Sequence, residues 1–317
     1  MAQGGPDRPQ KVVQAEITYI DLPPPPEGFG KTRGISGEYL NALQSADALL
    51  VVARAFNDPD VAHVDDTVDP IRDADNMLME MTFSDIEILD RRLDKLKDGF
   101  KSAKSQERDL LTREVNILEN IRMELDRGVG LRDQAITLDE SRRIAGFGFL
   151  SAKPVIVVVN VGEGQLSEIE SLETKFGNSF SGKDIEVSVF CAQLEMDLVQ
   201  MDPEDEQEFR DDLGTGESGL SKMVQISYDV VGQISFFTVG EDECRAWEVR
   251  RDTVAQEAAG KIHSDLERGF IRAEVMSYEQ LVECGNLVEA RKRGLLRQEG
   301  KDYVLNDGEI MHVLFNV

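Results

Sequence analysis

The chain has 317 residues, which is enough for two or three domains with a substantial core. Its 35 basic and 61 acidic residues give a net charge of −26, which disfavours nonspecific binding to nucleic acid or to an anionic membrane surface. The three cysteines and three histidines are scattered, so neither a disulfide framework nor a zinc spacing is present. No signal peptide and no apolar run near the ~20 residues of a membrane span is visible, and we expect a cytoplasmic protein.

The N-terminal segment contains one expected strand and a misleading motif. Residues 1–10 are polar and form an expected flexible leader, and residues 15–21 alternate polar and apolar side chains as a strand does. Four prolines at 23–26 predict a stiff loop. Gly28–Thr32 ends in GKT, but a phosphate loop of the form GxxxxGK[ST] needs glycine at position 25, where the chain has proline. Proline removes backbone N–H donors, so we expect no phosphate loop here.

The clearest strand lies in the middle of the chain. Five aliphatic residues at 155–159 predict an interior strand of a parallel α/β sheet, and residues 48–55 predict a second buried strand. Asn160 and Glu163 follow the first of these, where open α/β sheets bind ligands. An amide and a carboxylate suit the edge of a purine base. The alternative is a polar turn that only ends the strand.

Between these two strands the apolar period becomes helical. Two series of apolar residues predict a pair of long helices that form an antiparallel hairpin, turning near 98–106. Ile121 lies slightly off the second series. The members are Ile86, Leu89, Leu93 and Leu96 in the first series, and Leu111, Val115, Leu118 and Leu125 in the second. We expect an inserted helical domain at 76–145, with two ordinary amphipathic helices on the core as the alternative.

The segment after the central strand continues the α/β pattern. Residues 185–191 predict a further strand, which Ala192 follows, and Cys191 is expected to be a small buried residue. The acidic run at 202–212 predicts a solvated helix face. Residues 220–231 predict another helix.

The last 86 residues have a different pattern of apolar residues, which predicts strands at their beginning and end. Residues 233–239 and 244–249 predict a hairpin, and residues 302–316 predict a terminal hairpin around the turn at Asn306. A helix between them predicts a compact β-grasp-like module. This module is the least acidic part of the chain and contains the basic run 291–293, so it is the candidate for contact with RNA.

These strings together resemble the YchF / Obg-like ATPases, a branch of the translation-factor GTPases. The resemblance is carried by ESGLSKMVQISYDVVG (217–232), SFFTVGEDECRAW (235–247), AQEAAGKIHSDLERGFIRAEV (255–275) and EGKDYVLNDGEIMHVLFNV (299–317). It implies an α/β fold with an incomplete G-domain-like parallel sheet at 11–75 and 146–231. It further implies that the hairpin at 76–145 is inserted in this domain and that residues 232–317 form a TGS domain of β-grasp type.

The resemblance also implies a site and its ligand. Asn160, Val161 and Glu163 match the family's NxxE, which stands in place of the usual NKxD and implies adenine rather than guanine. Cys191 and Ala192 match the second base-facing loop, which approaches with backbone groups. The family binds ATP or GTP with Mg²⁺, hydrolyses it slowly and associates with ribosomes. We therefore expect a monomer that contacts the ribosome or RNA through its TGS domain, and neither DNA nor a membrane.

Two departures from the family pattern put the phosphate site in doubt. The portion with the first strand, the phosphate loop and the first switch is not among these residues, through a truncated gene model or a true loss. The family's Asp-x-x-Gly reads Asp21 to Pro24, so Asp21 can face a magnesium ion through water, but proline has no N–H for the γ-phosphate. Losing about 6 kcal/mol of such contacts lowers affinity about ten-thousand-fold.

Two functional hypotheses follow. The first is a YchF-like ATPase or GTPase that is impaired or inactive as written, with no catalytic residue assigned. The second is a nucleotide-independent adaptor that binds ribosomes or RNA through the TGS domain and the hairpin. Without a strand between them, residues 15–21 and 48–55 are expected to pair directly, or to leave a gap. That gap would be lined by Ile17, Tyr19, Leu50 and Val52.

Overall fold

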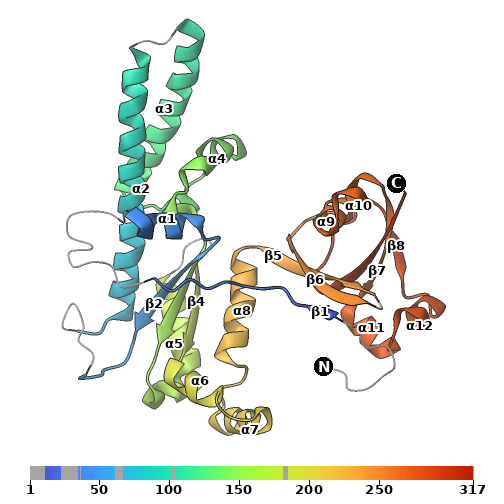
Figure 1. Cartoon of the computed structure of the whole chain (residues 1–317). Coiled ribbons are helices and arrows are strands. Elements are labelled where there is room, and N and C mark those ends of the chain that lie inside the picture. The colour runs from blue at the N-terminus through green and yellow to red at the C-terminus, as the bar shows by residue number, and fades with distance from the viewer. Residues whose placement is uncertain are drawn as a thin grey trace. The chain divides into compact units, whose positions relative to one another are not determined.

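The computed structural model describes residues 11–22, 35, 37–60, 67–101, 104–180, 185–240 and 242–316. The chain divides into two compact units (Figure 1). Unit 1 consists of Met1–Ile20 and Gly232–Val317, and unit 2 is Asp21–Val231. The fold is mixed α/β, and each unit contains its own sheet.

The described residues of unit 2 contain a parallel sheet of three strands in the order β2-β3-β4. In β3, residues 155–159 are buried on both faces, and the prediction of an interior strand is confirmed. One face packs against Phe176 of α5, and the other packs against Met223 of α8. The strands are β2 (Leu49–Arg54), β3 (Val155–Asn160) and β4 (Ile185–Phe190), and the helices that contribute to the core around them include α1 (Gly37–Ser45), α2 (Pro70–Phe100), α5 (Ile169–Ser179) and α8 (Gly219–Val230).

Strand β2 is only half buried. Leu49, Val51 and Ala53 are in the core, whereas Leu50 and Val52 on the other face are 42% and 63% exposed. Among the described residues β2 pairs with β3 alone. Of the four side chains predicted to line a gap, Leu50 and Val52 are therefore open to solvent, as is Tyr19 at 49% exposure, whereas Ile17 is half-buried.

The predicted strand at 15–21 is wrong, and so is its assignment to the sheet of unit 2. The structure has strand β1 at Lys11–Val13, and it pairs in parallel with β6 of unit 1. The Lys11 N–H donates to the Asp242 carbonyl at 3.0 Å, and the Lys11 ammonium lies 3.3 Å from the Glu243 carboxylate. A segment with alternating polar and apolar residues forms a strand only where another strand can pair with its backbone. The edge of β6 pairs with residues 11–13 and not with residues 15–21.

The helical hairpin predicted from periodicity is present as α2 (Pro70–Phe100) and α3 (Ser105–Asp126). Figure 1 shows these two helices side by side, extending away from the sheet. Their seam contains Leu89 and Leu118, both almost fully buried, and Ile121 is only 2% exposed. Ile121 therefore belongs to the seam, because a helix of 3.6 residues per turn drifts away from an ideal heptad.

A buried carboxylate joins the hairpin to the start of β3. Asp85 of α2 accepts hydrogen bonds from the backbone N–H groups of Leu150 (2.8 Å) and Ser151 (2.7 Å). Burial raises the pKa of Asp85 to about 6, although the bonds from Ser151 and Leu150 act in the opposite direction. The chain between hairpin and strand forms η1 (Leu131–Asp133), α4 (Leu138–Ile144), η2 (Ala145–Phe147) and η3 (Leu150–Ala152). The separate inserted domain at 76–145 stays a proposal, since these residues share unit 2 with the sheet.

Unit 1 contains a mixed sheet of six strands in the order β1-β6-β5-β9-β7-β8. Phe236 of β5 is fully buried against α9 on one face, and Met276 of β7 packs with Ala290 of α12 on the other. The elements are β5 (Gln233–Val239), β6 (Glu243–Arg250), α9 (Ala255–Ile262), α10 (Ser264–Arg268), β7 (Phe270–Ser277), α11 (Tyr278–Cys284), α12 (Leu287–Lys292), β8 (Arg297–Glu299) and β9 (Glu309–Phe315).

The predicted terminal hairpin at 302–316 is wrong, although its turn is present. Strand β9 pairs antiparallel with β7 and parallel with β5, and no strand precedes the turn at Asn306 within 302–316. The Asp307 carboxylate instead accepts the Ser235 N–H at 2.7 Å. The turn thus places β9 inside the sheet, where both of its edges are paired. The residues of a hairpin turn indicate that the chain reverses its direction. They do not determine which strands pair with the strand that follows the turn.

Candidate functional site

The carboxyl ends of the three parallel strands of unit 2 meet at one edge of the sheet. Arg54 at the end of β2 is in register with Asn160 at the end of β3, and Asn160 is in register with Phe190 of β4. The loops after β3 and β4 therefore leave the sheet side by side. This edge is where open parallel sheets bind ligands, and it contains the residues that the sequence selected.

Asn160 ties these two loops together. Its side-chain oxygen accepts the backbone N–H of Ala192 at 3.0 Å, and the Val161 N–H donates to the Phe190 carbonyl at 3.1 Å. The sequence therefore selected residues that do come together from two separate strands. Because an amide has both an acceptor and two donor hydrogens, Asn160 keeps its N–H donors after holding Ala192.

The remaining predicted residues have distinct settings. Val161 and Cys191 are almost fully buried, at 1% and 3% exposure, so they present backbone rather than side chains to this edge. Burial of Cys191 confirms the prediction of a small core residue. Glu163 is exposed at the start of η4 (Glu163–Glu168), and Ala192 is half-buried at the start of α6 (Ala192–Leu198). The exposed carboxylate and the backbone of Ala192 are thus the accessible groups.

Two further residues at this edge were not selected from the sequence. The Arg54 guanidinium lies 4.9 Å from the centre of the Phe56 ring, and its Nε donates to the Phe56 carbonyl at 2.9 Å. A Cβ added to Gly162 would lie 3.2 Å from the Phe56 Cβ, so the loop after β3 passes close to this aromatic residue. The signal in the sequence that could have identified this pair is the basic residue Arg54 at the end of a buried strand.

The predicted metal residue, Asp21, lies near the end of the described segment 11–22. Asp21 is exposed and lies outside the helices and strands, and no hydrogen bond or ion pair among the described residues joins it to Asn160 or Glu163. Within the described ranges no three His, Cys, Asp or Glu side chains are grouped to hold a metal ion. Mg²⁺ in nucleotide sites is typically held by one or two carboxylates together with phosphates and water, so Asp21 would supply one ligand at most. The motif at 28–32 and the prolines at 23–26 lie outside the described residues.

A buried ion cluster, also missed from the sequence, supports the loop after β4. Arg210 of α7 (Pro203–Leu213) donates to both oxygens of Glu195 on α6, at 2.9 and 2.8 Å, and also pairs with Glu206. The Gly219 N–H of α8 donates to the same Glu195 carboxylate at 2.9 Å. Burial raises the pKa of Glu195, but the bonds from Arg210 and Gly219 outweigh it and hold that pKa below its usual value. We call these four residues the Arg210 clamp.

The basic run of unit 1 is partly neutralised by its own neighbours. Arg291 pairs with Glu274 at 2.7 Å, and both Lys292 and Arg293 pair with Glu289. These three cations were the sequence-based reason for expecting contact with RNA. Two carboxylates face these three cations, so part of their charge is compensated, and the run offers a phosphate backbone less than its sequence indicates.

Comparison with known proteins places this architecture. The family model YchF-GTPase_C, described as a protein of unknown function (DUF933), matches residues 233–316. The ribosome-binding ATPase YchF of Bacillus subtilis is 34% identical over 311 residues, which cover 98% of this chain and 84% of the relative. The chain belongs to the YchF family. The YchF of Escherichia coli O157:H7 is 30% identical over 316 residues, with coverage of 98% and 84%.

A solved YchF structure has the same fold. The YchF GTPase of Schizosaccharomyces pombe superposes with a TM-score of 0.75 and 29% sequence identity, covering 89% of this chain and 75% of that chain. The resemblance to YchF proteins seen in the sequence is thereby confirmed, as is the α/β class with a parallel sheet. No helix in the described part of the chain is long and apolar enough to cross a membrane.

Proposed function

We propose that this chain is a YchF-type nucleotide-binding protein that associates with ribosomes in the cytoplasm and recognises an adenine base at the ends of β3 and β4. The observation that carries the proposal is the hydrogen bond from the Ala192 N–H to the Asn160 side chain, at 3.0 Å. It joins the two loops from which the proposed base contacts would come. The names of the relatives support both the nucleotide and the ribosome.

The chemistry of the two polar side chains favours adenine. The Glu163 carboxylate is exposed and only accepts hydrogen bonds, so it pairs with the 6-amino group of adenine and is repelled by the carbonyl oxygen of guanine. The Asn160 amide supplies donors for a ring nitrogen. Magnesium, when bound with the nucleotide, would neutralise phosphate oxygens, and Asp21 would hold it through water. No residue of the chain is proposed as a catalytic group.

We further propose that hydrolysis is slow or absent. Position 24 has proline where the family pattern has the glycine whose N–H meets the γ-phosphate. A transition state that gains charge on phosphate loses that donor, and the cost is larger than for ground-state binding. Residues 232–317 are proposed to be the TGS domain through which the protein contacts the ribosome.

Saturation-transfer NMR with the purified chain tests base recognition, because it detects binding even at millimolar dissociation constants. We expect ATP to bind more tightly than GTP, and Asn160→Ala to raise the dissociation constant for ATP at least tenfold. Glu168→Gln, an exposed carboxylate on the same η4, is the matched control and should leave binding unchanged. Equal ATP binding by Asn160→Ala and the wild type would refute the proposed base site.

The second candidate is a nucleotide-independent ribosome adaptor. Proline at position 24 favours it, because the family pattern has there the glycine whose N–H meets the γ-phosphate, and proline has no N–H to donate. Co-sedimentation with ribosomes, with and without ATP, distinguishes the two. The adaptor sediments equally in both conditions, whereas the nucleotide-dependent protein changes its bound fraction with ATP.

A further inference from the structure

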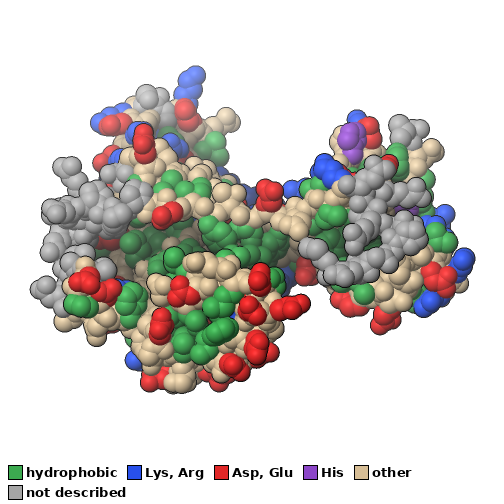
Figure 2. Space-filling view, turned by 60° about the horizontal axis from the view of Figure 1, so that its bottom comes forward, with side chains coloured by type: hydrophobic (Ala, Val, Ile, Leu, Met, Phe, Trp, Pro, Cys, Tyr) green, Lys and Arg blue, Asp and Glu red, His purple; other side chains and the backbone are tan. Residues whose placement is uncertain are grey.

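Among the large apolar side chains exposed on the consecutive helices α6, α7 and α8 of unit 2, or at the end of α6, five are at least 44% exposed. They are Met196 (62% exposed), Val199 (63%), Phe209 (50%), Leu213 (44%) and Leu220 (64%). We call these five residues the α6–α8 patch. Figure 2, which brings this end of unit 2 toward the viewer, shows hydrophobic side chains at the surface with acidic side chains around them. Apolar groups gathered at a surface with a polar rim are typical of an interaction site.

The Arg210 clamp holds the helices of this patch in fixed positions. Met196 follows Glu195, Phe209 precedes Arg210, and Leu220 follows Gly219, so three members of the patch are chain neighbours of clamp residues. Arg210 itself is 2% exposed and pairs with carboxylates from both α6 and α7. The cluster joins α6 and α7 to the first residue of α8, so it links the three helices from which the patch residues come.

Negative charge borders the patch. Residues 192–231 contain eleven acidic side chains and two basic ones, Arg210 and Lys222, and both basic ones are paired with carboxylates. On α7, Asp205 and Asp212 are one helical turn before and after Phe209 and are exposed. The Phe209 and Leu213 pair, four residues apart, therefore presents an apolar stripe next to two carboxylates.

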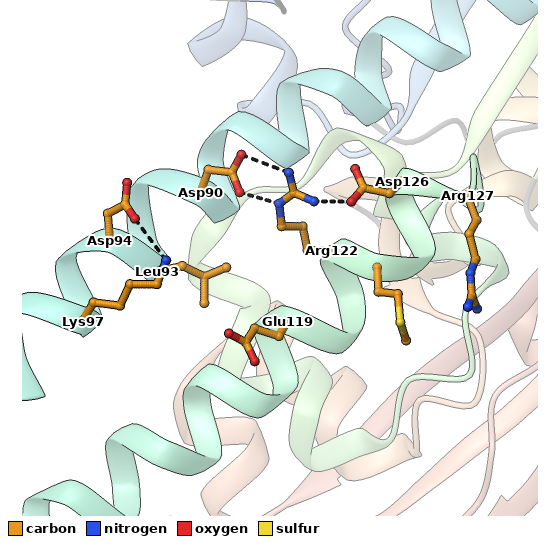
Figure 3. A pocket seen from close by; sticks show the side chains of 9 residues that line it. Asp90, Leu93, Asp94, Lys97, Glu119, Arg122, Asp126 and Arg127 are labelled. Atoms are coloured by element: carbon orange, nitrogen blue, oxygen red, sulfur yellow. Dashed lines mark hydrogen bonds and ion pairs between the residues drawn. The ribbon is translucent and has the colours of Figure 1, made fainter.

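The hairpin offers an instructive contrast. A hollow between α2 and α3 also contains several carboxylates, but Asp90 and Asp126 both point at Arg122 and pair with it (Figure 3). The charge of these two carboxylates is compensated by Arg122 within the hairpin. Asp205 and Asp212 beside Phe209 have no such ion-pair partner among the described residues, so their charge is available to a ligand.

We propose that the α6–α8 patch binds a basic amphipathic segment of a partner protein. Large apolar side chains of that segment would cover Phe209 and Leu213, and its lysines or arginines would face Asp205 and Asp212. The same negative charge repels nucleic acid, an anionic membrane surface and a second copy of this chain. The surface needs no nucleotide, so this inference stands independently of the base site.

Fluorescence anisotropy with the full chain tests the proposal. The probe is a labelled 18-residue peptide of leucine and lysine, with the leucines at helical spacing. We expect binding that the double variant Phe209→Ser, Leu213→Ser weakens at least tenfold, because both side chains are exposed and their loss leaves the core intact. Leu138→Ser is the matched control, since Leu138 is 81% exposed on α4, and it should bind as the wild type does.

Two further arms test the charge and the alternative occupant. Asp205→Lys with Asp212→Lys should weaken the peptide at least fivefold, and a peptide with glutamate in place of lysine should not bind. Equal binding of both peptides, or unchanged binding by the double serine variant, would overturn the proposal. Sedimentation velocity completes the test: a dimer lost in the serine variant would show that the patch binds a second copy instead.

Discussion

The folds of the two units are stabilised by different kinds of interaction. Among the described residues, eight buried polar or charged side chains lie in unit 2, whereas unit 1 contains one, Glu309. In unit 1 the sheet is covered on both faces by apolar residues, with Phe236 at the centre. In unit 2 the apolar contacts of the sheet are supplemented by Asp85 and by the Arg210 clamp, each of which joins separate segments.

This difference follows from the number of strands. Six strands offer faces wide enough for two apolar layers, whereas three strands, one of them half exposed, leave the surrounding helices with less to pack against. Buried hydrogen-bonded ions then fix where those helices lie. Unit 2 should accordingly respond to loss of a buried polar group, and unit 1 to loss of a core side chain.

The largest effect is expected in the core of unit 1. Phe236→Ala removes a fully buried ring and should cost about 4 kcal/mol of unfolding free energy. Trp247 of β6 is the one tryptophan of the chain, so its fluorescence in urea reports on unit 1. The transition seen by Trp247 should move to lower urea, while the helical circular dichroism of unit 2 stays in place. A shift of both signals together would show that the units unfold as one.

A somewhat smaller effect is expected from the clamp. Arg210→Ala leaves the Glu195 carboxylate buried without its partner and should cost about 3 kcal/mol, measured by circular dichroism in urea. Arg122→Ala on the hairpin is the control. Its guanidinium is 32% exposed, and the loss should stay below about 1 kcal/mol. Equal losses from the two variants would contradict the distinction between a buried clamp and a surface ion pair.

The smallest effect concerns pH. Because burial holds the pKa of Asp85 at about 6, the folded state binds a proton more strongly than the unfolded state, whose pKa is near 3.8. This group therefore favours folding most at low pH, and its contribution declines as the pH rises from about 4 to about 6. Asp85→Asn removes that dependence. The stability of the variant relative to the wild type should rise by about 2 kcal/mol between pH 4.5 and 7.5.

Urea denaturation of both proteins at several pH values measures this difference. Ser84→Ala provides the control on the same helix, because it removes a neighbouring buried hydroxyl without a titratable group. A relative stability of Asp85→Asn that stays constant with pH would show that Asp85 remains ionised across this range.

Apolar periodicity predicted much of this architecture from the sequence. The run at 155–159 specified the interior strand, and the seams of α2 and α3 specified the hairpin, because these patterns report burial directly. The clamp was not predictable in the same way. Arg210 lies inside an acidic run that reads as a solvated helix face, and only the fold reveals that this single cation is buried against Glu195.

The candidate site was predicted in part. Asn160 and Ala192 do meet, because the ends of adjacent parallel strands must share an edge. The contribution of Phe56 depends on how the chain turns after β2, which no local pattern encodes. The strand expected at 15–21 failed for a similar reason: local alternation does not say which edge will accept a strand, and here β6 accepted Lys11–Val13.

That pairing has a consequence for the order in which the protein is made. Lys11 and its partner Glu243 are separated by about 230 residues, so β1 leaves the ribosome long before β6 exists. At ordinary elongation rates the interval is on the order of ten seconds or more. During this time all of unit 2 is synthesised, while the backbone groups of β1 that pair with β6 have no strand partner. Strand β1, the first described strand to be synthesised, is thus among the last to pair with its neighbour in the sheet.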